Sequence, residues 1–156
     1  MIPFNIAPVT GKEYGYIADA INHHEVGGDL TYTKKCTKWM MDKLEAQKVL
    51  LTTSGTTALD MAILLCRLNP GDEVILPSFT FSSTATSIVN GGGVPVFVDI
   101  RPDTMNIDET KIESAITDKT KAIMVMHYAG VSCEMDTIME IAKKYNLYVI
   151  EDAAQA

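Results

Sequence analysis

The chain has 156 residues, which is enough for one domain with a sizeable hydrophobic core. Hydrophobic residues make up 47% of it and charged residues 21%, which is typical of a folded globular protein. The formal net charge of −7 argues against a surface that binds nucleic acid or an anionic membrane. A local phosphate site stays open, because backbone N–H groups can form one.

The cysteines and histidines give no sign of a disulfide framework or a metal site. Cys36, Cys66 and Cys133 are odd in number and widely spaced, which favours reduced thiols and a cytoplasmic location. His23 and His24 diverge on a predicted helix with only the distant Cys36 nearby, so we expect no metal there. No apolar stretch approaches membrane-spanning length, and we expect no membrane insertion.

The first 46 residues predict an N-terminal helical segment. Thr10 and Glu13 fit a capping box, a hydroxyl residue followed three positions later by a carboxylate. This box predicts a helix that continues towards His24, where a glycine pair breaks it. Residues 33–46 predict a second, amphipathic helix.

The stretch from Lys48 to Leu68 is central to the prediction. Residues 49–51 are apolar and long enough for a buried strand, and residues 52–57 form a small polar turn. From Ala58 the apolar residues cover nearly the whole helix circumference, which predicts a buried helix. Free N–H groups and the positive dipole end at its start suit a phosphate, although Ser54 or Thr56 could merely cap the helix. Both alternatives stay open on this segment alone.

Strands and helices then alternate to the end of the chain. This order predicts a three-layer α/β/α fold with a mostly parallel sheet covered on both faces. Pro95 places its strand near an edge, because proline cannot donate a ladder hydrogen bond, and Ser132 can cap the helix that follows it. The expected strands are 73–77, 94–100, 121–127 and 147–150, and the expected helices lie within 79–89, 109–116 and 134–145.

Ligands in such sheets bind at the carboxyl ends of the strands. Residues 54–57, 78–83, 127–130 and 152–155 lie at such ends. Asp152 could hold a carboxylate against a protonated cofactor ring nitrogen, or could cap a following helix. Phe81 could stack on a flat cofactor or belong to the core. His127 could be an acid or base, or could be hydrogen-bonded in place.

No dinucleotide, P-loop or nucleophile-elbow motif is present in the sequence. Instead, eight short motifs in order resemble the DegT/StrS-type nucleotide-sugar aminotransferases, which are fold-type-I pyridoxal 5'-phosphate (PLP) enzymes. The motifs are IPFN (2–5), GDLTYT (28–33), SGTTAL (54–59), PGDEVI (70–75), PSFTFSST (77–84), VD (98–99), HYAG (127–130) and EDAAQ (151–155).

The resemblance implies a PLP site. A hydroxyl and a backbone N–H from the turn would grip the phosphate, an aromatic ring would stack on the pyridine, a carboxylate would pair with the ring nitrogen, and an amide would bond the ring hydroxyl. In the same order, these residues are Gly55, Thr56 (hydroxyl) and Thr57 (N–H), then Phe81, Asp152 and Gln155.

The resemblance also implies an activity, which is transamination of a keto-sugar nucleotide with glutamate as amino donor. Residues 101–118 look most like the family members that act on a dTDP-linked 4-keto-6-deoxy sugar. Residues 47–156 would be the N-terminal part of the PLP-binding large domain, without the rest of that domain and the small C-terminal domain. A homodimer with active sites at the subunit interface is expected for the full-length protein.

One departure from the family matters most. Members carry the Schiff-base lysine in an S-F-H-x-x-K type of motif beyond EDAAQ, and the lysines at 119, 121, 143 and 144 do not match it. We therefore expect an N-terminal fragment that is inactive alone. A non-catalytic binding or interaction module remains an alternative, as does a sugar dehydratase with histidine in place of the lysine. The coding sequence downstream of codon 156 would discriminate among them.

Overall fold

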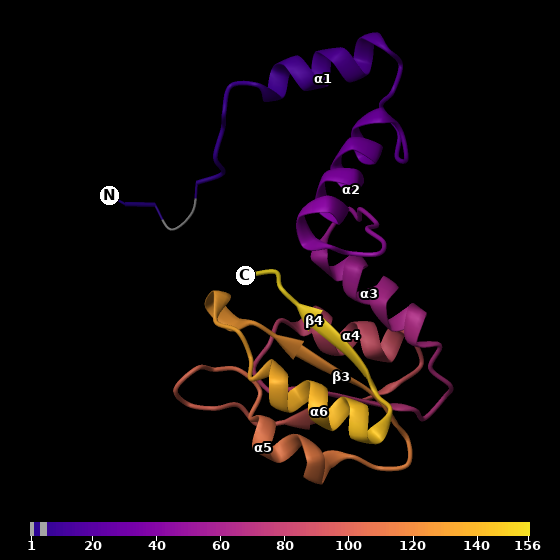
Figure 1. Cartoon of the computed structure of the whole chain (residues 1–156), viewed down its shortest axis with the longest axis vertical. Coiled ribbons are helices and arrows are strands. Elements are labelled where there is room, and N and C mark those ends of the chain that lie inside the picture. Colours follow the sequence, from indigo (N-terminus) through magenta and orange to yellow (C-terminus); the bar gives the residue numbers. More distant parts are fainter. Residues whose placement is uncertain (1, 4–5) are drawn as a thin grey trace. The chain divides into compact units, whose positions relative to one another are not determined.

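The protein is described by a computed structural model that covers residues 2–3 and 6–156 (Figure 1). Phe4 and Asn5, part of the first family-like motif, lie outside the described residues. The chain divides into two compact units, one ending at Leu51 and one beginning at Thr52. None of the helices in the described part of the chain is long and apolar enough to cross a membrane.

The first unit contains α1 (Glu13–Asn22) and α2 (Thr31–Leu44), and neither helix buries a residue. The Glu13 carboxylate accepts hydrogen bonds from the N–H of Thr10 (2.7 Å) and the N–H of Gly11 (2.8 Å). These bonds lower the pKa of Glu13 to about 2, with the Thr10 backbone as the largest cause. The predicted capping box therefore forms only in part. The Glu13 carboxylate accepts the Thr10 N–H, but no side-chain hydrogen bond caps the start of α1.

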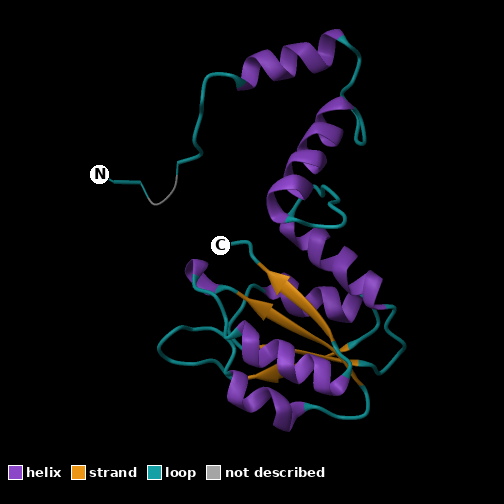
Figure 2. Ribbon diagram, viewed as in Figure 1, coloured by secondary structure: helices purple, strands orange, loops and turns teal. Residues whose placement is uncertain are grey.

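The second unit is built on a four-stranded sheet in which every pair of neighbours is parallel (Figure 2). The predicted parallel sheet is confirmed, and the Pro95 strand lies at an edge as predicted. In the order β2-β1-β3-β4, the strands are β2 (Val94–Val98), β1 (Glu73–Pro77), β3 (Thr120–Met126) and β4 (Tyr148–Asp152).

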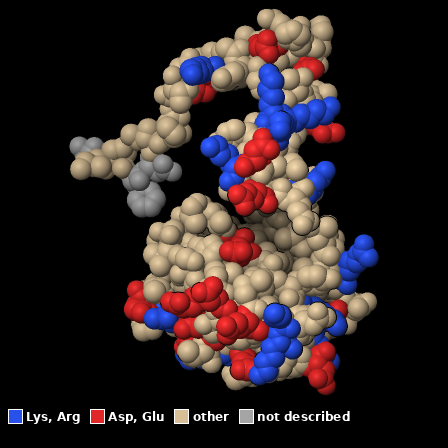
Figure 3. Space-filling view, viewed as in Figure 1, with Lys and Arg blue, Asp and Glu red and all other residues tan. Residues whose placement is uncertain are grey.

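Helices cover both faces of this sheet, which confirms the three-layer α/β/α arrangement (Figure 1). Alternation along β1 sends Val74 and Leu76 into one core and Ile75 into the other. One core contains residues of α3 (Gly55–Cys66) and α4 (Ser82–Asn90); the other contains residues of α5 (Glu109–Ile112) and α6 (Met135–Tyr145). Charged side chains gather over α5 and α6 in Figure 3. Lys144 of α6 forms an ion pair with Glu113, which directly follows α5.

Two predictions for the central stretch are wrong. Residues 49–51 form no strand, and Leu50 and Leu51 are exposed. A strand exists only through pairing, and no described segment pairs with these residues. Helix α3 buries Leu59 and Ile63 but leaves Leu64 and Leu65 about 70% exposed. A helix lying on one sheet face buries one stripe, and nothing else in the second unit covers the opposite side of α3.

Several boundaries also differ from prediction. Strand β2 ends at Val98, and the helix predicted for 109–116 splits into α5 and a short 3-10 helix, η1 (Glu113–Ala115). The Ser132 hydroxyl donates to the Cys133 carbonyl (2.9 Å) and does not cap α6. Residues 153–155 form a turn rather than the start of a helix.

Candidate functional site

The candidate site lies at the carboxyl ends of the strands. From β1 the chain passes through α4 to β2 on one side, and then through α5 to β3 on the other side of β1. Parallel sheets bind ligands at such a reversal of strand order. A cavity of about 320 Å³, in the size range of small-molecule sites, lies there. Its lining residues are Gly55, Thr56, Leu59, Phe81, Ser83, Met126, Asp152, Ala154 and Gln155.

One wall of the cavity is the N-terminus of α3. Ser54 caps the helix, since its Oγ accepts the N–H of Thr57 at 3.1 Å. The N–H groups of Gly55 and Thr56 have no acceptor among the described residues, as expected for a first helical turn. Capping by Ser54 therefore leaves the N–H groups of Gly55 and Thr56 available to an anion. Thr57 does not line the cavity, and its N–H could reach an anion only if Ser54 rotated away.

Phe81 and Ser83 follow β1 at the start of α4. The Phe81 side chain is 66% exposed, so the alternative of a core role is wrong. Ser83, in the first turn of α4, is buried and also lines the cavity. An exposed aromatic face at a strand end can cover a flat ring.

Asp152 is the last residue of β4. Its Oδ1 accepts the N–H of Ala154 at 3.0 Å, as a turn cap would, and its backbone oxygen accepts the N–H of His127 at 3.1 Å. The second carboxylate oxygen, Oδ2, has no donor among the residues that the structure describes. That oxygen is available to a protonated group in the cavity.

Gln155 is held through its side-chain oxygen. Oε1 accepts the N–H of Ala129 at 2.7 Å, so the amide NH₂ group stays available as a donor. Ala129 belongs to η2 (Tyr128–Gly130), a short 3-10 turn that follows β3.

His127 lies outside the cavity lining and is hydrogen-bonded in place. Its Nδ1 accepts the N–H of Cys133 at 3.1 Å, which leaves Nε2–H to donate to Glu151 at 2.9 Å. The ring is 8% exposed, and both nitrogens are engaged. His23 bonds to Asp19, and the described residues contain no group of three or more His, Cys, Asp or Glu side chains that could hold a metal.

The donor set of the cavity fits PLP. Free N–H groups suit a phosphate, an exposed aromatic ring suits the pyridine face, and a free carboxylate oxygen suits a protonated ring nitrogen. Five of the six predicted cofactor residues line one cavity; the sixth, Thr57, lies beside it. Sequence reasoning assigned no task to four lining residues, which are Leu59, Ser83, Met126 and Ala154, although the predicted strand-end segments 78–83 and 152–155 contain Ser83 and Ala154. Met126 is the last residue of β3, and the predicted strand ran one residue further, to His127.

Solved structures define the class of protein. NtdA from Bacillus subtilis, with its bound cofactor PMP, is 40% identical, with a TM-score of 0.84 over 95% of this chain and 35% of that one. The Escherichia coli GDP-4-keto-6-deoxy-D-mannose-3-dehydratase, with bound hydrated PLP, is 27% identical, with a TM-score of 0.88 over 97% of this chain and 40% of that one. The fold is therefore part of a PLP-dependent fold-type-I domain.

The family follows from the sequence comparison. This chain belongs to the DegT/DnrJ/EryC1/StrS aminotransferase family, whose model matches residues 14–156. GDP-perosamine synthase from Caulobacter vibrioides is 39% identical over 94% of this chain, and the chain spans 39% of that relative. Membership in this aminotransferase family confirms the resemblance that the motifs indicated.

Proposed function

We propose that residues 1–156 form the N-terminal part of an aminotransferase that transfers the amino group of glutamate to a dTDP-linked 4-keto-6-deoxy sugar. Residues 1–46 are its helical segment, and residues 47–156 begin its PLP-binding large domain. The observation that carries the proposal is the cavity at the strand ends, where an anion site, an aromatic face and a carboxylate converge. Family membership supports the chemistry. The choice of a dTDP sugar rests on the resemblance of residues 101–118 to family members that act on such a sugar.

The five predicted cofactor residues that line the cavity each have a proposed task. PLP, when bound, supplies a ring that stabilises negative charge on a neighbouring carbon. Gly55 and Thr56 bind the phosphate through N–H groups, and Thr56 adds its hydroxyl. The side chain of Phe81 covers the ring. Asp152 keeps a proton on the ring nitrogen, and the Gln155 amide donates to the ring hydroxyl.

A second function is compatible with the same fold. The dehydratase from Escherichia coli has nearly the same TM-score as the PMP-bound NtdA, so the fold of this region does not separate the two chemistries. The family position that carries lysine in aminotransferases and histidine in the dehydratases has no counterpart in residues 1–156. The runner-up is therefore a PLP-dependent dehydratase of the same family.

The test uses the full natural protein that contains residues 1–156. We expect it to bind PLP and, with glutamate, to convert dTDP-4-keto-6-deoxyglucose into a product that contains nitrogen, measured by mass spectrometry. The matched substrate is GDP-4-keto-6-deoxymannose. Amination of that sugar alone would reassign the nucleotide, and loss of a hydroxyl without gain of nitrogen would favour the dehydratase. Failure to bind PLP would refute both functions.

A further inference from the structure

The turn that contacts Gln155 has an unfavourable backbone. Ala129 adopts φ 51° and ψ 26°, the left-handed conformation that a residue with a Cβ seldom adopts. Such a residue persists only where its surroundings hold it. The next residue, Gly130, has φ +80°, and a Cβ there would come within 3.1 Å of the Gln155 carbonyl oxygen. The backbone of the turn therefore lies close to the backbone of Gln155, and the left-handed conformation of Ala129 requires contacts that hold it.

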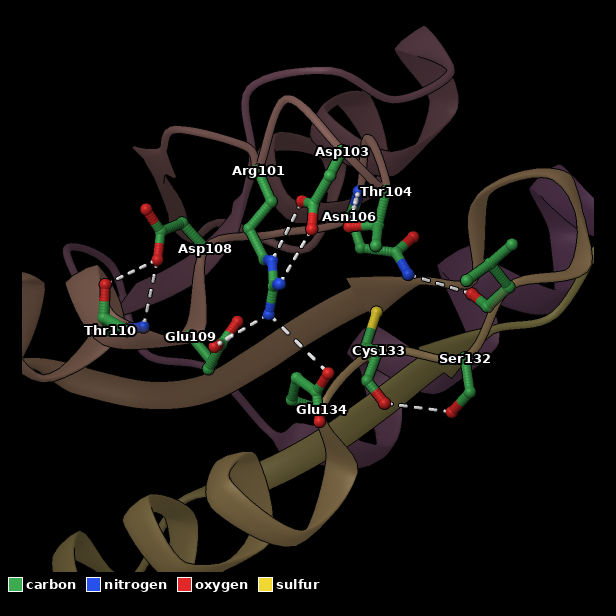
Figure 4. Close-up of polar contacts among 11 residues, drawn as sticks. Arg101, Asp103, Thr104, Asn106, Asp108, Glu109, Thr110, Ser132, Cys133 and Glu134 are labelled. Carbon is green, nitrogen blue, oxygen red and sulfur yellow. Dashed lines mark hydrogen bonds and ion pairs between the residues drawn. The ribbon is translucent and has the colours of Figure 1, made fainter.

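Asn106 provides that anchor from a different segment. Its side chain is almost completely buried, and its Oδ1 accepts the N–H of Tyr128 at 2.9 Å. Its Nδ2 donates to the carbonyl of Val131, also at 2.9 Å. In Figure 4 the Asn106 amide points across to the loop that leads to Ser132. One side chain thus binds both ends of the loop that contains Ala129.

Asn106 is itself held in a well-bonded turn. Its backbone oxygen accepts the N–H of Arg101 at 2.9 Å, and its N–H donates to Thr104 Oγ1 at 3.3 Å. The Arg101 guanidinium binds Asp103 at 2.9 Å and Glu109 at 3.2 Å (Figure 4). These bonds fix the turn after β2. Asn106 is therefore held in place where its side chain binds the loop after β3.

We propose that Asn106 is a positioning residue for the cofactor cavity, and that it acts on Gln155 through the Tyr128–Val131 loop. Asn106 keeps Ala129 in its left-handed conformation, the Ala129 N–H holds Gln155 Oε1, and the amide NH₂ group then faces the cofactor. This inference rests on the proposed PLP function. It adds a residue that does not line the cavity and that no motif in the sequence indicated.

The test is a double-mutant cycle in the full natural protein, with the dissociation constant of PLP as the readout. Asn106→Ala and Gln155→Ala should each weaken PLP binding roughly ten-fold, the scale of one lost hydrogen bond to a polar or charged group. The double variant should be no weaker than Gln155→Ala, since both changes remove the same contact. Additive losses would show that Asn106 does not act through Gln155 and would overturn the proposal.

Two further variants separate positioning from general stability. Asn90→Ala makes the same substitution at an exposed position whose side chain forms no hydrogen bond among the described residues, and it should leave PLP affinity unchanged. Ala129→Gly should restore part of the affinity lost in Asn106→Ala, because glycine adopts positive φ without a steric cost. Asn106→Asp keeps the acceptor for Tyr128 and loses the donor to Val131. If Asn106→Ala does not fold, Asn106→Asp takes its place in the cycle.

A measurement without cofactor separates failure of the inference from failure of the proposed function. Amide hydrogen exchange of Ala129 should accelerate in Asn106→Ala and stay slow in Asn90→Ala. Unchanged exchange at Ala129 would overturn the anchor itself. If exchange accelerates but neither Gln155→Ala nor Asp152→Asn changes PLP affinity, the proposed cofactor site is wrong and the anchor stands. If those two variants weaken PLP binding and Asn106→Ala does not, only the inference fails.

Discussion

Asp152 lines the cavity, and the N–H of Ala154 donates to one of its carboxylate oxygens, which leaves the other without a donor among the described residues. We predict that Asp152→Asn in the full natural protein folds nearly as well as the wild type but loses about 100- to 1,000-fold in rate. The amide can still accept the Ala154 N–H, but it carries no charge to hold a proton on the ring nitrogen. Steady-state kinetics and a thermal melt measure the two effects.

The control for this prediction is Asp99→Asn. Asp99 follows the edge strand β2 at the same end of the sheet and does not line the cavity. It should keep wild-type turnover. If Asp152→Ala turned over normally and was only less stable, the turn-capping role would explain the carboxylate.

Cys133 gives the second residue-scale prediction. Burial, followed by the nearby charge of Glu151, raises the pKa of its thiol from 9.0 to about 11. As the pH rises, the Cys133 thiol therefore ionises in the unfolded chain before it ionises in the folded protein. The stability linked to this thiol is fully present below about pH 9 and is lost as the pH rises to about 11. Denaturant unfolding of wild type and Cys133→Ala should show this extra alkaline loss in the wild type only. Parallel pH curves for the two proteins would contradict it.

Residue types at the strand ends could be predicted, and tertiary hydrogen bonds could not. Gly55, Phe81 and Asp152 each follow or begin an element with a clear local signal, so the sequence placed them near one another. Asn106 has no such signal, because its partners Tyr128 and Val131 lie more than twenty residues along the chain. A hydrogen bond between two loops depends on how the whole sheet brings them together.

At the scale of elements, the N-cap of α3 can be tested directly. Ser54→Ala removes the acceptor for the Thr57 N–H and should lower the free energy of unfolding by about 1 kcal/mol, with a smaller loss for Ser54→Gly. Ser114→Ala is the matched control, since its hydroxyl donates to the Lys111 carbonyl and caps no helix. Equal midpoints for Ser54→Ala and Ser114→Ala in urea would contradict the capping role.

The order of strands and helices was predictable, whereas the pairing and cover of each element were not. Apolar runs such as Ile123 to Val125 predict buried strands because parallel strands are covered on both faces. The run at residues 49–51 carries the same signal, and it stays unpaired because a strand also needs a free neighbour. Helix α3 shows the same limit. Apolar residues around its circumference indicate that another segment must cover the helix, but they do not identify that segment.

At the scale of the whole molecule, the two units leave apolar surface uncovered. Helix α3 exposes Leu64 and Leu65, and edge strand β2 exposes Phe97. Edge strand β4 also exposes Tyr148, and its outer backbone groups pair with no described strand. Helices α1 and α2 bury no residue. Exposed apolar patches and open sheet edges favour contacts with other chains.

We therefore predict that the isolated 156-residue chain associates with itself and binds a hydrophobic dye more strongly than the full natural protein does. Replacing Leu64 and Leu65 with Lys should reduce both effects, because the change places charge on the uncovered stripe of α3. Lys substitution of Ser114, an exposed polar site on η1, is the control and should reduce neither. Sedimentation velocity and dye fluorescence are the measurements. A monodisperse wild-type monomer with a cooperative melt and little dye binding would show that these residues form a self-sufficient domain, and it would favour a non-catalytic binding module over part of an aminotransferase.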